Sequence, residues 1–301
     1  MIDILLATFN SERHLAAQLD SLLAQTERGW RLIVRDAGST DSTMSILSGY
    51  GARDSRIRVV PGAPARACAN FAGLLECSDA PYVMFCDHDD VWFPEKIARS
   101  LSRIKALENT SSPDMPALVF TDAVVTDERL EAIAPSFFRR SALDPARLSP
   151  AQLAFQNVAP GCTMILNAAL RRKALPVPDD AVMHDHWMML VASVFGRIDC
   201  LREPTVFYRQ HGGNVLGSPC VDCGYFLGRI RRGPGPLRRR LYANIRQAAA
   251  FVARFGDEAP ECLHAAASLG SCSFLERRRL ILRHRLFKNG ILRNLGTLAV
   301  V

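Results

Sequence analysis

Short apolar runs alternate with segments of helical spacing along the first ninety residues, and this alternation constrains the fold more than any other feature of the chain. The runs have the length of buried strands and comprise Ile2–Ala7, Trp30–Arg35, Ile57–Val60 and Tyr82–Cys86. Strands that alternate with helices form right-handed βαβ units, and these units build a mainly parallel sheet covered by helices on both faces. We therefore predict an α/β fold.

Two later apolar runs, Ala117–Asp122 and Thr163–Asn167, are strand-like and are expected to extend the same sheet. The pattern changes after Gly217, where a cysteine-containing and then strongly basic segment begins. We therefore expect one α/β domain over residues 1–217, followed by a basic helical C-terminal region over residues 218–301.

The bulk composition favours an ordinary globular protein, because 49% of the residues are hydrophobic and 22% are charged. No apolar run is long enough to span a bilayer, and the start of the chain lacks the pattern of a signal peptide, so we expect a cytoplasmic protein. The nine cysteines are irregularly spaced, which favours reduced thiols over a disulfide framework. A structural zinc site at Cys220 and Cys223 remains an alternative for the one CxxC pair.

The net charge of +7 is concentrated in the last quarter of the chain, from Arg229 onward. A basic segment of this kind favours an anionic surface. Apolar residues recur at helical spacing between the basic ones, which favours a membrane surface, a partner helix or self-association over nucleic acid. These residues are Leu280, Ile281, Leu286, Phe287, Ile291, Leu292, Leu295 and Leu298. A solvated helical subdomain packed on the core is the alternative.

Three carboxylates, those of Asp87, Asp89 and Asp90, follow the strand pattern of Tyr82–Cys86 within four residues. Like charges this close are costly unless a cation or water neutralises them, so the cluster indicates a site for a hard divalent metal, which in turn would bind phosphate. The alternative is a solvated turn in which Asp90 caps a helix with Pro94–Glu95 in its first turn.

Two further polar loops, Thr8–Glu12 and Asp36–Asp41, also follow predicted strands. In parallel sheets ligands bind at the carboxyl ends of the strands, where these loops and Asp87–Asp90 should meet. Turn composition alone does not require three polar clusters from separate parts of the chain to converge. The metal and phosphate interpretation is therefore favoured over the helix cap.

At this point residues 1–217 resemble glycosyltransferase family 2, and within it the rhamnosyltransferase-like bacterial members. The resemblance rests on seven segments in order: Ala7–Asn10, Asp36–Asp41, Asn70–Phe71, Asp87–Trp92, Gly161–Thr163, His184–Trp187 and Tyr208–Asn214. It implies a GT-A fold, in which one nucleotide-binding α/β domain continues into an acceptor-binding half. It also implies binding of a nucleotide-sugar donor by Thr8, Phe9, Asn10, Glu12, Asp36, Asn70, Asp87, His88 and Trp187.

The same resemblance implies that Asp87 and Asp89, with His211 nearby, hold Mg²⁺ or Mn²⁺ against the donor diphosphate, and that Asp185 is the catalytic base. Alternatives stay open at several of these positions. His211 is otherwise a loop histidine, Trp187 is otherwise a core residue, and the histidines that flank Asp185 either tune it or simply pack.

Departures from the family pattern concern the donor more than the reaction. The chain has Ala37 where a second acid commonly contacts the nucleobase, His88 where Gln is frequent and Gly213 where Asn is frequent. The resemblance implies an inverting transfer, with dTDP-rhamnose as a candidate donor. The expected acceptor is a glycan, either free or lipid-linked, and the expected place of reaction is the inner face of the plasma membrane. A metal-dependent phosphohydrolase and a decayed nucleotide-sugar or glycan-binding module are the alternatives.

Overall fold

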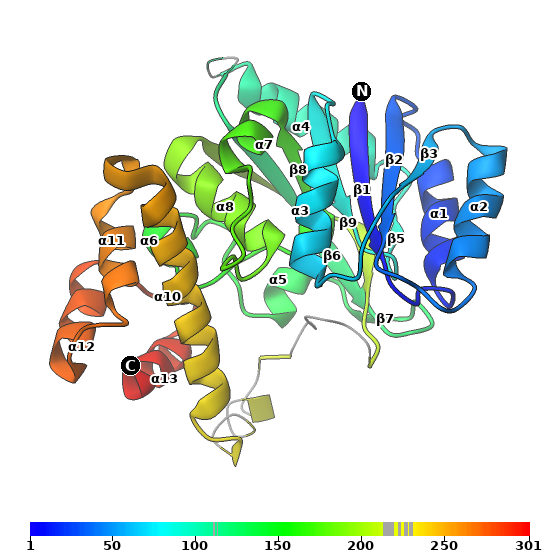
Figure 1. The fold of residues 1–301 in the computed structure, drawn as a ribbon. Helices are drawn as coiled ribbons and strands as arrows, with labels where there is room; N and C mark the ends of the chain where they lie inside the picture. The colour runs from blue at the N-terminus through cyan, green and yellow to red at the C-terminus, as the bar shows by residue number, and fades with distance from the viewer. Residues whose placement is uncertain (111, 113, 213–219, 222–223, 226–227, 229–230) are drawn as a thin grey trace.

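The computed structural model describes residues 1–301 except 111, 113, 213–219, 222–223, 226–227 and 229–230 (Figure 1). Its centre is a nine-stranded sheet with the order β3-β2-β1-β4-β8-β6-β9-β5, and β7 pairs with β6 at the side. Helices cover both faces of this sheet, and a further group of helices lies beyond α8. The predicted α/β architecture is confirmed.

The first part of the sheet is parallel and consists of the four predicted strands, which pair in the order β3-β2-β1-β4. The bounds of its strands and helices are β1 Ile2–Thr8, α1 Leu15–Leu23, β2 Trp30–Asp36, α2 Thr43–Arg53, β3 Ile57–Val60, α3 Ala67–Cys77 and β4 Tyr82–Cys86.

β1, β2 and β4 are mostly apolar because both of their faces are buried, whereas β3 is an edge strand whose two middle residues are exposed. Along β4, Val83 and Phe85 point into the core that includes α3 and α8, whereas Met84 and Cys86 point into the core beneath α1 and α4. All four side chains are fully buried. Because successive side chains of a strand point to opposite faces of the sheet, one apolar run contributes side chains to two cores.

The second part of the sheet is mixed: β8 is antiparallel to both β4 and β6, while β6 and β9 are parallel. Both later runs therefore extend the same sheet, as predicted. The bounds in this part are β5 Val91–Trp92, α4 Lys96–Glu108, β6 Ala117–Thr126, β7 Ala132–Ala134, α5 Phe137–Arg140, α6 Pro150–Leu153, η1 Gly161–Thr163, β8 Met164–Asn167, α7 Ala168–Ala174, α8 His184–Phe195 and β9 Arg197–Arg209.

The short strand β5 was not predicted, and it overturns the helix-cap alternative for the acid cluster. Helix α4 begins at Lys96, with Glu95 as its N-cap residue. Asp90 instead precedes β5, and its Oδ1 accepts a hydrogen bond of 3.1 Å from the backbone N–H of Arg209. Pairing of β5 with β9 pins this loop to the sheet.

The C-terminal helices are α10 Gly235–Phe255, α11 Glu261–Ser268, α12 Phe274–Arg283 and α13 Ile291–Val300, with the short turn η2 Gly256–Glu258 after α10. Phe251 of α10 packs against Trp187 of α8, with 5.6 Å between the ring centroids. Its neighbours in the same apolar core include Leu263 of α11 and Ile281 of α12. The C-terminal helices therefore share a core with the sheet.

The predicted boundary at residues 217 and 218 falls within the segment 213–219, outside the described residues, as do Gly213 and Cys223. The domain division and the zinc alternative accordingly stay predictions. Among the helices that the structure describes, none combines the length and the apolar character needed to cross a bilayer.

Candidate active site

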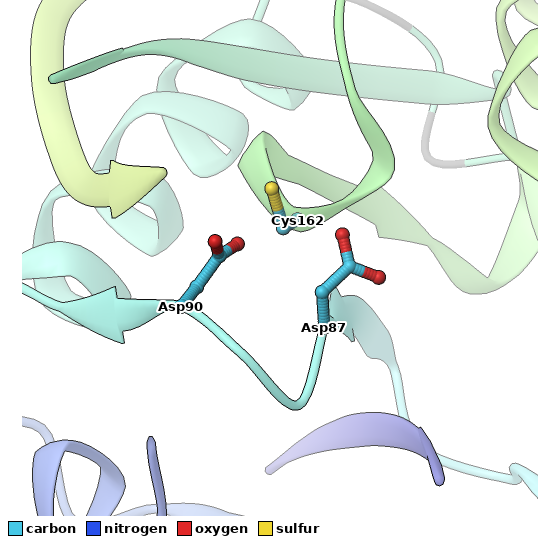
Figure 2. Close-up of side chains that lie close together, drawn as sticks. All are labelled: Asp87, Asp90 and Cys162. Atoms are coloured by element: carbon cyan, nitrogen blue, oxygen red, sulfur yellow. The ribbon is translucent and has the colours of Figure 1, made fainter. Parts of the chain in front are cut away.

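The acid loop between β4 and β5 brings two carboxylates and a thiol together. Ligand atoms of Asp87, Asp90 and Cys162 all lie within 4.8 Å of one another, and the three side chains converge in Figure 2. Cys162 belongs to the turn η1 and is fully buried. Burial and the charges of Asp89 and Asp185 raise the pKa of Asp87 to about 7, while a hydrogen bond from Cys162 opposes the shift.

Asp89 points from the same loop to His211, and its Oδ2 lies 2.7 Å from His211 Nε2. Asp89 is 7% exposed, whereas Asp87 and His211 are only partly buried. Arg209, at the end of β9, donates from Nε to the carbonyl oxygen of Asp89 at 2.6 Å. Strand β9 thereby holds the acid loop in place and presents His211 to it.

Asp90 is the most deeply buried acid of the cluster. Its Oδ2 has no hydrogen-bond partner among the described residues, and burial together with the charges of Asp89 and Asp87 raises its pKa well above the ordinary value. Lys96 is also fully buried, donates to Thr205 Oγ1 at 3.2 Å and lies over the Trp92 ring. Burial lowers the pKa of Lys96 to about 8.

Cys162 and Lys96 were missed as neighbours of the acid cluster. Gly161–Thr163 was noted as a motif, but a buried thiol is the usual state of cysteine. Lys96 stands a few residues after the acids in the sequence, where a lysine at the start of a helix gives no sign of a contact with them. Only the folding of η1 and α4 against the loop brings these residues to Asp90.

The loops after β1 and β2 are tied together by the residues predicted to bind the donor. Thr8 Oγ1 donates to Asp36 Oδ1 at 2.8 Å, and the backbone N–H of Thr40 donates to Asn10 Oδ1 at 2.9 Å. Glu12 Oε2 accepts from the backbone N–H of Ser42 at 2.9 Å. Asn10 has a φ of 46°, in the left-handed region that Asn tolerates better than most residues. These side chains therefore shape the loops.

Asp36 is saturated with hydrogen bonds. Its Oδ2 accepts from the backbone N–H groups of Gly38 and Ser39, and its Oδ1 accepts from the hydroxyls of Ser39 and Thr8. Burial raises the pKa of Asp36, but these hydrogen bonds outweigh it and hold the pKa below its usual value. A carboxylate has about four acceptor positions, so a nucleobase would have to displace one of these donors.

The remaining predicted donor-site residues differ in exposure. Phe9 is 57% exposed, at the tip of the loop after β1. Asn70 in α3 is 3% exposed, and its Oδ1 has no partner among the described residues. A buried acceptor without a partner is costly, so Asn70 Oδ1 is suited to accept a hydrogen bond from a bound ligand. His88 is partly buried next to Asp89, and burial lowers its pKa.

Asp185 lies on the second part of the site, in the first turn of α8. Its Oδ2 accepts from the backbone N–H of Gly161 at 3.0 Å, and its Oδ1 accepts from the backbone N–H of His186 at 2.5 Å. Burial nevertheless raises its pKa to about 7, against these bonds and a bond from Asn157. Its charge in turn acts on Asp87, so the two carboxylates face one site.

Gly161 permits this approach of η1 to α8. A Cβ atom at Gly161 would lie 2.8 Å from His184 Nε2, closer than side chains tolerate. The His184 ring stacks on Phe71 with 3.9 Å between the centroids, and neither ring nitrogen has a partner among the described residues. Burial lowers the pKa of His184 to about 3, so the ring is neutral at physiological pH.

The other two residues next to Asp185 have packing roles. His186 Nε2 lies 2.5 Å from the carbonyl oxygen of Leu153, and burial lowers its pKa to about 4. Trp187 is fully buried, and its Nε1 donates to the carbonyl oxygen of Ala174 at 2.9 Å. The structure thus favours the core alternative for Trp187 over the predicted wall of a sugar pocket, because α10 covers its ring.

The chemistry of the cluster fits a divalent cation. The buried Asp90 Oδ2 without a partner and the raised pKa of Asp87 are features of carboxylates that lack a counter-charge. The predicted ligand set is Asp87, Asp89 and His211, whereas the ligand atoms that lie within 4.8 Å of one another belong to Asp87, Asp90 and Cys162. Carboxylates suit Mg²⁺ and Mn²⁺, whereas an imidazole ligand is better suited to the transition metal.

A sheet whose carboxyl edge carries an acid cluster, two polar loops and a buried carboxylate on an adjoining helix has the GT-A architecture. Among solved structures, residues 1–349 of TarS from S. aureus in complex with UDP-GlcNAc give a TM-score of 0.60 at 14% identity, with 95% of this chain and 73% of that chain covered. This similarity shows the fold.

Sequence comparisons give the class of enzyme. Residues 3–142 match the model of the family "Glycosyl transferase family 2". The dTDP-rhamnosyl transferase RfbG of Shigella flexneri is 27% identical over 231 residues, which is 71% of this chain and 74% of RfbG. The Escherichia coli protein WfgD, a UDP-Glc:alpha-D-GlcNAc-diphosphoundecaprenol beta-1,3-glucosyltransferase, is 28% identical over 103 residues, 34% of this chain and 40% of WfgD.

These matches confirm the resemblance to glycosyltransferase family 2, and the chain is a glycosyltransferase. They favour this class over a phosphohydrolase. The match to the family ends at residue 142, so it includes the acid cluster but neither Asp185 nor His211.

Proposed function

We propose that this protein is an inverting, metal-dependent glycosyltransferase that moves a sugar from a nucleotide-diphosphate donor to a hydroxyl group of a cell-surface glycan. Rhamnose is the sugar we favour, since RfbG is a dTDP-rhamnosyl transferase. Asp87, Asp89 and His211 are the proposed metal ligands, and Asp185 is the proposed base.

The observation that carries this proposal is the placement of Asp185 opposite the acid cluster. An inverting transfer needs a carboxylate on the acceptor side and a place for the diphosphate on the donor side. Asp185 approaches from α8, whereas Asp87 and Asp89 approach from the loop after β4, and the charge of Asp185 raises the pKa of Asp87. A base with a pKa of about 7 is matched to neutral pH.

In the proposed reaction, the acceptor oxygen attacks the anomeric carbon while Asp185 takes the proton of that hydroxyl group. The bond from the anomeric carbon to the diphosphate oxygen breaks, and its electron pair leaves with the nucleoside diphosphate. Bound Mg²⁺ or Mn²⁺ supplies stabilisation of the negative charge on the diphosphate. The backbone N–H groups of Gly161 and His186 hold the Asp185 carboxylate in position.

The donor side is proposed to consist of Thr8, Phe9, Asn10, Glu12, Asp36, Asn70, Asp87 and His88. Asn70 offers the acceptor Oδ1, and exposed Phe9 offers an aromatic face. The acceptor is proposed to be lipid-linked, because the name of WfgD gives a diphosphoundecaprenol acceptor for that protein. The reaction then takes place in the cytoplasm, at the inner face of the plasma membrane.

A thermal-shift panel tests donor binding. The chain is heated with dTDP, UDP, GDP and their sugar nucleotides, each with and without Mn²⁺. A ligand at 100 times its dissociation constant stabilises by about 2.7 kcal/mol. We expect dTDP-rhamnose with Mn²⁺ to give the largest shift. Equal shifts for all nucleotides, or none with any metal, would contradict the proposed donor.

Slow hydrolysis of the donor separates an enzyme from a decayed binding module. We expect release of nucleoside diphosphate in the presence of Mn²⁺ and its loss in the Asp87→Asn variant. Asp180→Asn is a matched control, because Asp180 is exposed and pairs with Arg246 on the surface. Donor binding without any turnover, in hydrolysis or in transfer, would favour the binding module.

A further inference from the structure

Large apolar side chains are exposed in unusual number on the hairpin formed by α12 and α13 (residues 274–300). Of the thirteen large hydrophobic residues exposed in the described part of the chain, six belong to this hairpin. They are Phe274, Leu275, Leu282, Ile291, Leu292 and Leu295, and each is more than half exposed. Such a concentration indicates an interaction surface.

The hairpin is nevertheless well packed on its other side. Ile281 and Leu286 are buried at 1% exposure each and belong to the apolar core shared with the sheet. Arg278 of α12 donates to the carbonyl oxygens of Leu298 at 2.5 Å and Val301 at 2.9 Å, which ties α12 to the C-terminal end of α13. The exposed residues are therefore the outer face of a fixed element.

The charge of the segment decides between a lipid surface and a second copy of the chain. Residues 271–301 carry seven basic side chains and one acidic side chain, and Arg279, Arg283 and Arg285 are exposed. A symmetric contact would bring two faces of the same positive charge together, which is unfavourable. An anionic bilayer offers complementary charge to the arginines and an apolar boundary to the exposed leucines.

The hairpin is also connected to the catalytic base. Asn289, between α12 and α13, donates from its backbone N–H to Gln156 Oε1 at 2.7 Å, and its Oδ1 accepts from the backbone N–H of Asp144 at 2.9 Å. The residue after Gln156 is Asn157, which hydrogen-bonds to Asp185. In Figure 1, β1 runs downward from the N-terminus, so the carboxyl edge of the sheet faces the same end of the molecule as α13.

We propose that the α12–α13 hairpin docks on an anionic lipid surface and thereby presents the Asp185 side of the site to an acceptor held in the bilayer. This docking role rests on the proposed function, because it requires the lipid-linked acceptor proposed there. It makes the hairpin an interfacial element, with the leucines and isoleucine inserted and the arginines at the headgroups.

Co-sedimentation of the full chain with lipid vesicles tests the proposal. We expect binding to vesicles of phosphatidylcholine and phosphatidylglycerol in equal parts, and weak binding to phosphatidylcholine alone. The double variant Arg279→Ser, Arg283→Ser should bind roughly 30-fold more weakly, since each basic residue near an anionic surface contributes about fivefold. The double variant Ile291→Asp, Leu295→Asp should lose at least about tenfold.

The matched control is Met44→Asp, which alters an exposed apolar residue on α2 at 43% exposure, and should bind vesicles as the unaltered chain does. Each variant is checked for its unfolding temperature and for donor hydrolysis with Mn²⁺, both of which should be unchanged. Absence of vesicle binding, or equal binding by all variants, overturns the docking proposal. A self-association that the hairpin variants abolish, without vesicle binding, also overturns it and assigns the face to a second copy.

The failure of the proposed function gives a different result. If the chain binds anionic vesicles through the hairpin but hydrolyses and transfers no nucleotide sugar, the transferase proposal fails while the docking surface stands. If donor hydrolysis is normal but no vesicle is bound, only the docking proposal fails.

Discussion

The donor loops and the start of α8 hold carboxylates in opposite environments. Asp36, after β2, accepts four hydrogen bonds and has a pKa below its usual value. Asp185, in the first turn of α8, also accepts hydrogen bonds, from Gly161, His186 and Asn157, but it is buried whereas Asp36 is only partly buried, and its pKa is raised to about 7. Solvation by the protein itself outweighs burial in the first case but not in the second.

This difference distinguishes a carboxylate that stabilises a loop from a carboxylate that can act as a base. A carboxylate fixed by four donors is a stable part of the loop and a poor proton acceptor. A carboxylate with a raised pKa takes a proton readily at neutral pH. Asp87 and Asp90 of the acid cluster after β4 resemble Asp185 rather than Asp36, because burial and the neighbouring carboxylates raise their pKa values. The following experiments test this division.

Asp185→Asn should have the largest effect. The amide keeps the size of the side chain but cannot take the acceptor proton, so turnover should fall about 10²–10⁴-fold while donor binding changes little. Transfer assays and thermal shifts with the donor measure the two effects separately. Wild-type transfer by Asp185→Asn would remove Asp185 from the role of base, and Asp180→Asn serves as the control.

Asp89→Asn tests the metal side of the comparison. Loss of a residue that hydrogen-bonds to a metal ligand typically weakens metal binding by about 10–100-fold. Loss of the ligand itself should therefore weaken metal binding by more than about 100-fold. Transfer is measured against Mn²⁺ concentration, with exposed Glu131→Gln as control. His211→Ala should change the metal requirement in the same direction. An unchanged Mn²⁺ dependence in both variants would exclude this pair from the metal site.

The pH dependence of transfer should follow the raised pKa of Asp185. The base works only when it is ionised, so below a pH of about 7 the rate should fall about tenfold for each pH unit, and above it the rate should level off. The measurement is kcat/KM for the donor at saturating Mn²⁺. A rate that stays constant down to pH values near 4, the ordinary pKa of Asp, would show that burial does not govern Asp185.

Trp187→Phe should have the smallest effect on catalysis. Because the ring lies in the core beneath α10, we expect a loss of about 1–3 kcal/mol in the free energy of unfolding and an unchanged KM for the donor. Urea unfolding and donor kinetics measure the two quantities. A raised KM with unchanged stability would return Trp187 to the sugar pocket.

The parallel half of the fold could be predicted from the sequence because three of its four strands, β1, β2 and β4, are buried on both faces and are therefore mostly apolar runs. β4 is the clearest case, because Val83 and Met84 point into the cores on opposite faces of the sheet. Strand β5 could not be predicted, since two residues have no period, and only its pairing with β9 makes it a strand.

The site was predictable where residues lie next to one another in the sequence and less so where folding brings them together. Asp87 and Asp89 are visible as a cluster after an apolar run. Cys162 and Lys96 look like ordinary residues of a buried turn and a helix start, and only packing places them beside Asp90. The sequence left Trp187 open between a sugar-pocket wall and a core residue, and the structure favours the core because α10, more than forty residues later, covers its ring.

The saturation of Asp36 has a consequence for how donor preference can change. All four acceptor positions of this carboxylate are used to brace the loops after β1 and β2. Asn70, on α3, holds a buried Oδ1 that no described residue uses. If Asn70 contacts the donor as proposed, loop shape and donor recognition depend on different residues, and substitution at position 70 should change donor preference while leaving the hydrogen bonds of Asp36 intact.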